Sequence, residues 1–328
     1  MTYRARFAAH DTLRCMIDVE MPGAVDYARI ARQWFDAGFS VVGVEQRAAL
    51  ESGPKLPPEA IRRPMPSGPP GATWGFVSVT RYALKKVTKA GQQVFSPKES
   101  ARVWSPRSWA WFLEQLTDPP HDATLGTAHL SGTGYPEDPR IRMTAVRDKQ
   151  LPDWLRLAFS APESCLDAPD RQRSWLAFIK ETADSLNPAF GVIDYLYDSL
   201  YGQTAIESTV KPLNLMPWFD GLTMSRQVLR GYDWLTICPR ELADRLGGRQ
   251  ALRRTGAFHE VAQLSGGGVW LLATADYRDY DEAAMDRVFR ALAPVLPAGE
   301  PVLVDEKRAQ QGRDYRIVYR DAATDSPP

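Results

Sequence analysis

The chain has 328 residues, of which 44% are hydrophobic and 24% are charged. Its 40 basic residues balance 40 acidic residues, so no global electrostatic field points to nucleic acid or to a membrane surface. No run approaches about 18 apolar residues, which excludes a membrane-spanning helix, and the N-terminus lacks the apolar segment of a secretory signal. Three widely spaced cysteines argue against a disulfide framework and favour a reducing cytoplasm.

The first part of the chain predicts a strand, a helix and a second strand. Apolar and polar residues alternate over 13–19, and a helical pattern follows over 25–35. Gly38 is expected to end that helix before an apolar strand over 39–44. Residues 51–72 hold seven prolines, which indicates a surface loop because proline interrupts both helices and sheets.

The remaining elements follow from hydrophobic periodicity and from residues typical of helix starts. We expect strands over 74–84, 123–130, 141–146, 155–159 and 190–197, and a strand pair over 258–264 and 269–274. We expect helices over 105–116, 171–185 and 282–292, and a short helix after Cys238 that the segment 228–237 leads into.

Three short matches in the same order suggest an internal duplication. They pair AGFSVVG (37–43) with PAFGVID (188–194), SPR (105–107) with CPR (238–240), and HLSGTG (129–134) with QLSGGG (263–268). The predicted fold is therefore α+β, a tandem duplication of a β-α-β/β-α-β-β unit with mostly antiparallel sheets and helices packed on one face. We expect a first repeat over 1–150 that carries the loop 51–72, a second repeat over 151–300, and a C-terminal strand and tail over 301–328.

Cys238 raises the question of catalysis, because a cysteine in the first turn of a helix can be a reactive thiolate. Ser105 holds the matching position in the other repeat, and serine is a common N-cap, so we expect both positions to start helices. No cofactor or metal site is predicted, because the four histidines are not spaced as ligands. The alternative is an enzyme whose site lies between the repeats and combines Cys238, His259 and a carboxylate.

Two stretches interleave aspartates with tyrosines: DYLYDSLYG (194–202) and DYRDYDE (276–282). Tyrosine offers a large contact area, and carboxylates bind Arg and Lys of a partner, so these stretches suit binding to a basic protein. The alternative is that the tyrosines pack inward beside solvated acids. A third hypothesis, a nucleic-acid-binding module, uses the basic segment 81–89. The predicted partner-binding residues are Asp194, Tyr195, Tyr197, Asp198, Tyr201, Asp276, Tyr277, Asp279 and Tyr280.

The second half resembles the C-terminal part of the type VI immunity-protein family of polymorphic toxin systems. In that family a tryptophan-containing strand leads into a short helix that ends Leu-Gly-Gly, and a strand pair and a final helix follow. Here the matching segments are LRGYDWLTICPRELADRLGG (229–248), SGGGVWLLAT (265–274), NPAFGVIDYLY (187–197) and the end APVLP (293–297). The resemblance is best from about 150 to 300, and the N-terminal third matches poorly.

This resemblance implies a protein without a reaction of its own. Members are encoded beside a toxin of a contact-dependent secretion system, and they neutralise it inside the producing cell or its siblings. Their toxins include nucleases. The resemblance therefore implies a cytoplasmic immunity protein that occludes the active cleft of its toxin, and that binds neither nucleic acid nor a membrane.

Overall fold

A computed structural model describes residues 12–21, 27–54, 68–89, 93–147, 151–195 and 218–297. Its contacts divide the chain into two compact units: unit 1 comprises Met1–Glu20 and Leu166–Pro328, and unit 2 comprises Met21–Cys165. These units are defined by spatial contacts, whereas the repeats expected over 1–150 and 151–300 are segments of sequence. The bounds of the units and of the repeats differ.

Unit 2 is built on an antiparallel sheet. Its strands are β2 (Thr73–Val87), β3 (Gln93–Val103), β4 (Asp122–Leu130), β5 (Pro136–Arg147) and β6 (Trp154–Pro162), in the order β3-β2-β4-β5-β6. Side chains such as Val77, Leu125, Met143 and Leu157 are almost completely buried, as expected for a sheet that carries a helical layer.

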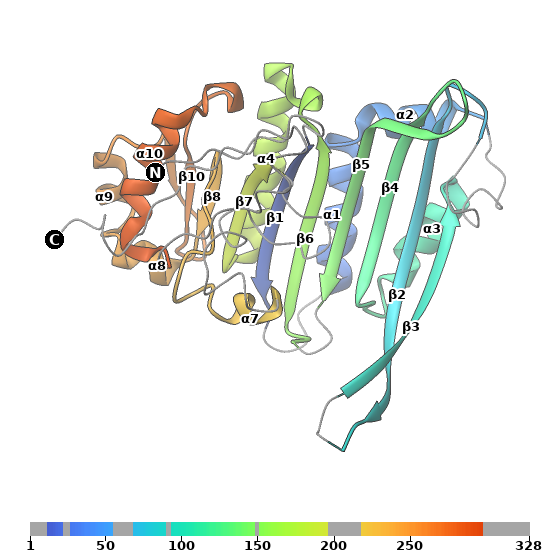
Figure 1. The fold of residues 1–328 in the computed structure, drawn as a ribbon, viewed down its shortest axis with the longest axis horizontal. Helices are drawn as coiled ribbons and strands as arrows, with labels where there is room; N and C mark the ends of the chain where they lie inside the picture. Colours follow the sequence, from blue (N-terminus) through green and yellow to red (C-terminus); the bar gives the residue numbers. More distant parts are fainter. Residues whose placement is uncertain are drawn as a thin grey trace, which may run out of the picture. The chain divides into compact units, whose positions relative to one another are not determined.

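The helices of unit 2 are α1 (Tyr27–Val41), α2 (Val44–Ser52) and α3 (Pro106–Gln115). α1 and α3 pack on each other through Phe35 and Phe112, whose ring centroids are 4.8 Å apart, and both lie on one side of the sheet (Figure 1). α3 begins where the sequence predicts. The Ser105 hydroxyl accepts a hydrogen bond from the Ser108 backbone N–H at 3.1 Å, and Pro106 is the first helical residue.

The strand expected over 39–44 is wrong. Gly38 does not end α1, because its carbonyl accepts the Val42 N–H at 2.7 Å and helical bonding continues. The Phe39 ring packs 5.8 Å from the ring of Trp109 on α3, so burial of an aromatic helix face outweighs the weak helix propensity of glycine. The prediction also missed α2 and β3.

Unit 1 is built on a second antiparallel arrangement of strands. These are β1 (Thr12–Glu20), β7 (Phe190–Tyr195), β8 (Leu235–Cys238), β9 (Glu260–Gln263) and β10 (Val269–Leu272), in the order β1-β7-β8-β10-β9. β1 is buried on both faces, since its residues from Leu13 to Val19 are each at most 5% exposed.

The helices of unit 1 follow the predicted pattern in α4 (Pro169–Leu186) and α10 (Glu282–Leu292). α4 ends at Asn187, which has a left-handed backbone with φ of 49°, and the Asp281 side chain caps α10 by accepting the Ala284 N–H at 2.8 Å. The remaining helical segments of unit 1 are α7 (Trp218–Thr223), α8 (Arg240–Arg245), α9 (Gly248–Arg254) and the 3-10 turns η3 (Tyr277–Asp279) and η4 (Ala293–Val295). A further 3-10 turn, η2 (Glu163–Leu166), lies at the boundary between the two units.

The chain therefore has an α+β fold with antiparallel strand pairing in each unit. Of the three sequence matches, SPR and CPR both precede a helix, and both glycine segments join antiparallel strands. The match of 37–43 with 188–194 aligns the end of a helix, α1, with a strand, β7, so these two segments differ in structure. Strand orders also differ, because β4 pairs with β2 whereas β9 pairs only with β10 among the described strands. The tandem duplication stays a hypothesis.

Candidate functional site

Two consecutive glycines shape the connection between α8 and α9. Gly247 and Gly248 have φ values of 79° and 71°, which lie in the left-handed region that favours glycine. A Cβ atom on Gly247 would also lie 2.8 Å from the Cβ of Ala251. The pair therefore lets the chain reverse sharply and present α9 beside β9.

Within unit 1, α9 is held in place by the burial of Leu252 and by a hydrogen bond from Arg253 to β9. Leu252 is 1% exposed, and the Arg253 Nε donates a hydrogen bond to the Val261 carbonyl of β9 at 3.2 Å. β9 is the last strand in the order of unit 1, so Arg253 covers part of a sheet edge whose backbone groups would otherwise meet solvent.

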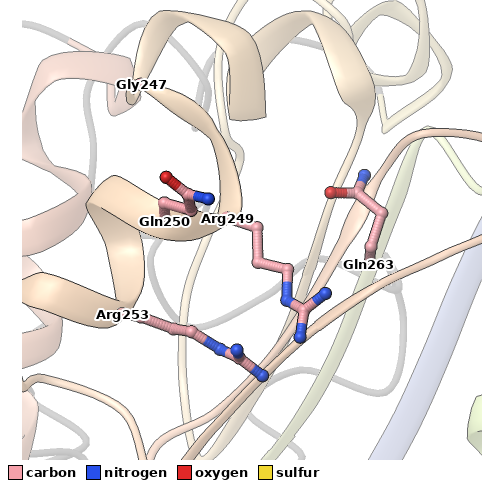
Figure 2. Close-up of a pocket in the computed structure, with 5 residues that line it drawn as sticks. All are labelled: Gly247, Arg249, Gln250, Arg253 and Gln263. Atoms are coloured by element: carbon pink, nitrogen blue, oxygen red, sulfur yellow. The ribbon is translucent and has the colours of Figure 1, made fainter.

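Arg249 and Arg253 are four residues apart on α9 and therefore share one face of the helix. They line an open depression of about 440 Å³, together with Gly247, Gln250 and Gln263. Figure 2 shows Arg249 extending from α9 toward Gln263, with the guanidinium of Arg253 beside it. Among the described residues, Arg249 has no hydrogen-bonding or ionic partner.

The Gln263 side chain supports the opposite wall of the depression. Its Nε2 donates to the Gly268 carbonyl at 3.0 Å, and the same β9–β10 turn is held by Asp184 of α4, whose carboxylate accepts both the Ser265 N–H and the Ser265 hydroxyl at 2.7 Å. These hydrogen bonds keep the pKa of Asp184 below its usual value.

The depression is suited to an oxyanion. No described lining residue carries a carboxylate, and two guanidinium groups in one depression can bind a carboxylate or phosphate through paired N–H donors. The sequence prediction missed these residues. The signal was present as arginines at 249 and 253 just after the Gly247-Gly248 pair.

In the first Asp/Tyr stretch, 194–202, only Asp194 has a described side chain, and that side chain is buried. Asp194 is 2% exposed, and its carboxylate accepts bonds from Arg14 Nε at 3.2 Å and Arg14 Nη2 at 3.0 Å. The expectation that Asp194 contacts a partner is therefore corrected, because its carboxylate is buried against Arg14. Tyr195 ends β7, and its side chain lies outside the described ones. Tyr197, Asp198 and Tyr201 also lie outside the described residues.

The second Asp/Tyr stretch divides into buried rings and exposed acids. Tyr277 and Tyr280 are 7% and 5% exposed, so the expectation that they contact a partner is corrected: their rings pack inward. Asp276 caps η3 and pairs with Arg278 at 2.6 Å, and these contacts hold the pKa of the Asp276 carboxyl well below its usual range. Partner binding stays a prediction for Asp276 and for the exposed Asp279.

Cys238 ends β8 rather than capping a helix, because Pro239 is the N-cap residue of α8. The cysteine is completely buried, and burial raises the pKa of its thiol well above the usual value. The thiol is therefore protonated near neutral pH and is not an activated nucleophile. His259 is exposed, and its backbone N–H donates to the Ala273 carbonyl at 3.1 Å.

We expect iodoacetamide at about pH 8 to spare Cys238 and Cys15 in the folded protein, because both are buried neutral thiols. Cys165 is partly exposed and provides an internal reference. Peptide mass spectrometry before and after unfolding in urea measures each cysteine separately. Rapid alkylation of Cys238 in the folded state would contradict this account and favour the enzyme hypothesis.

Neither a metal site nor a membrane-spanning helix is found in the ranges that the structure describes. No group of three His, Cys, Asp or Glu side chains in those ranges could hold a metal ion. No helix in the same ranges has the length and apolar character needed to cross a bilayer.

No protein-family model matches the chain, and no curated protein matches it significantly. A solved structure described as the Pseudomonas aeruginosa T6SS protein PA0821 is similar to it with 16% sequence identity and a TM-score of 0.49. The similarity covers 95% of this chain and 80% of that chain. This similarity does not bear on function.

Proposed function

We propose that this chain is an immunity protein of a type VI secretion system. It binds a cognate secreted antibacterial toxin in the cytoplasm of the producing cell and neutralises the toxin by occluding its active cleft. The resemblance of the segments 187–197, 229–248 and 265–274 to an immunity-protein family supports this proposal. The chain itself is proposed to catalyse no reaction.

The observation that carries the proposal is the paired guanidinium groups of Arg249 and Arg253 in an open depression. Arginine is enriched at the energetic centres of protein interfaces, and a guanidinium that lacks an intramolecular carboxylate is available for a carboxylate of a partner. This arrangement supports binding of a protein that presents Asp or Glu side chains.

We propose a nuclease as the class of toxin. The supporting argument is now the basic depression on α9 and no longer an acidic surface. The expectation rested on an acidic surface that would fit a basic DNA-binding cleft, but Asp194 is buried and Asp276 is paired with Arg278. Nucleases that hold metal ions with carboxylates present an acidic centre, which the arginines of α9 would match.

The proposal predicts that the double variant Arg249→Glu/Arg253→Glu binds its toxin about 100-fold more weakly, about tenfold for each guanidinium–carboxylate pair that is lost. The toxin to be used is the polypeptide encoded by the neighbouring reading frame, with a dissociation constant measured by calorimetry. Arg249→Glu alone should weaken binding about tenfold, and it leaves the bond from Arg253 to Val261 intact.

A matched control reverses two charges elsewhere in unit 1. Arg173 and Arg290 are 71% and 63% exposed and form only helical pairs with Asp170 and Asp286, so Arg173→Glu/Arg290→Glu should bind as the wild type does. Equal affinity of the α9 variants and the wild type would show that the depression is not the toxin contact.

A further inference from the structure

The β2–β3 hairpin continues beyond the sheet in which it starts. In the described pairing, β4 accompanies β2 only as far as Thr80, whereas β3 accompanies β2 as far as Val87. Residues 81–87 and 93–98 therefore form a two-stranded ribbon that projects from the sheet, as Figure 1 shows. We call this ribbon the hairpin arm.

The base of the hairpin arm is fixed to the neighbouring segment by polar contacts. The Arg81 guanidinium donates to the Asp118 carboxylate at 3.2 Å and to the Gln115 carbonyl at 3.0 Å. The Tyr82 backbone N–H donates to His121 Nδ1 at 3.2 Å. The arm therefore leaves the sheet from a defined point.

The pairing register gives the hairpin arm two different faces, because residues directly opposite each other in antiparallel strands share a face and successive residues alternate. Tyr82 lies opposite Pro97 and Leu84 opposite Phe95, and Val87 follows on the same side after the bulge, which makes one face mainly apolar. Arg81 lies opposite Lys98 and Lys86 opposite Val94, which makes the other face basic. A bulge falls between Leu84 and Lys86.

The apolar face meets solvent. Leu84 and Val87 are 53% and 55% exposed, and they are two of the four large exposed hydrophobic side chains in the part of the chain that the structure describes. A two-stranded ribbon has no second layer to bury such side chains. Neighbouring exposed apolar residues on a projecting element are typical of an interaction surface.

The charge of the hairpin arm is one-sided. Residues 81–98 contain Arg81, Lys85, Lys86, Lys89 and Lys98 and no acidic residue, in a chain whose net charge is zero. Arg81 is paired with Asp118, but Lys85, Lys86 and Lys98 have no acidic partner among the described residues. A partner that brings carboxylates to these lysines would complement the charge of the arm.

We infer that the hairpin arm docks on an apolar patch of the toxin that is rimmed by Asp and Glu side chains. This inference rests on the proposed function and adds a second contact element in unit 2. A protein partner fits better than nucleic acid, because Leu84 and Val87 cannot stack on bases. Tyr82 is half-buried, with its ring edge-on to His121 at 5.5 Å, and it offers no open stacking platform.

The test measures binding of the full-length chain to the polypeptide encoded by the neighbouring reading frame. We expect Leu84→Ser/Val87→Ser and Lys85→Glu/Lys86→Glu each to raise the dissociation constant about tenfold or more. The lysine variant should also make association slower and less dependent on salt. Both variants should keep the thermal unfolding midpoint of the wild type, since these side chains are exposed.

Tyr135→Ser is the control, because Tyr135 is also exposed, at 53%, but lies in the turn between β4 and β5. This turn is near the start of β2, where Thr73 pairs with His129, and the arm is at the other end of β2. It should bind as the wild type does. If the wild type binds and the arm variants bind equally well, this inference fails and the proposed function stands. If the wild type does not bind, both fail. Binding to a short DNA duplex is measured in parallel. If the lysine variant loses binding to this duplex but still binds the polypeptide as the wild type does, the arm is a nucleic-acid contact and the inference is overturned.

Discussion

Replacing Asp194 with alanine will lower the free energy of unfolding by about 3–5 kcal/mol. The variant leaves the Arg14 guanidinium buried without the carboxylate that accepts its Nε and Nη2 hydrogen bonds at 3.2 and 3.0 Å. Both side chains are at most 6% exposed, so the guanidinium stays buried when its carboxylate is removed. Urea unfolding followed by circular dichroism measures the change.

The matched control for this prediction is Asp279→Ala. Asp279 belongs to the other predicted Asp/Tyr stretch and is exposed, so its removal should change the free energy of unfolding by less than about 0.5 kcal/mol. Equal stability of Asp194→Ala and the wild type would contradict the structural role of Asp194 and return it to the candidate partner-binding residues.

Arg230→Ala is expected to be as damaging, with a loss of about 3–5 kcal/mol. Arg230 and Asp18 are each completely buried and form an ion pair through Nη2 and Oδ2. The guanidinium carbon also lies 4.5 Å from the ring centroid of Phe190, which the register of β1 and β7 sets opposite Asp18. Arg230→Lys should recover only part of the stability, because an ammonium group lacks the planar fork and the stacking surface.

A double-mutant cycle distinguishes a lost ion pair from general damage to the core. Asp18→Leu/Arg230→Met removes both charges and should be far more stable than either single variant, because an apolar pair leaves no buried charge without its partner. Losses that simply add would show that the two side chains do not interact in the native protein.

Sequence alone predicted the elements whose local signals and tertiary packing agree. α3 and α10 begin at the side-chain caps Ser105 and Asp281, and the alternation over 141–146 predicts the second half of β5. The run over 39–44 failed because a short apolar segment is compatible with either a strand or a buried helix face. β3 was missed because Pro97 and several charged residues mask its pattern, which is typical of an edge strand.

The candidate site was less predictable than the fold, because composition does not reveal which charges meet. Asp194 and Arg14 are 180 positions apart in the sequence, and only the pairing of β7 with β1 makes them neighbours. Likewise, Arg249 becomes a candidate binding residue only once α9, β9 and the Gly247-Gly248 reversal are placed together.

Neutralisation of the toxin is the central claim, and titration of toxin activity tests it most directly. The purified polypeptide encoded by the neighbouring reading frame should first be assayed for the activity that kills cells, beginning with nuclease activity. Increasing amounts of this chain should then abolish that activity at a near-equimolar ratio, and the Arg249→Glu/Arg253→Glu variant should require a large excess. Full toxin activity in the presence of excess folded wild-type protein would contradict the account.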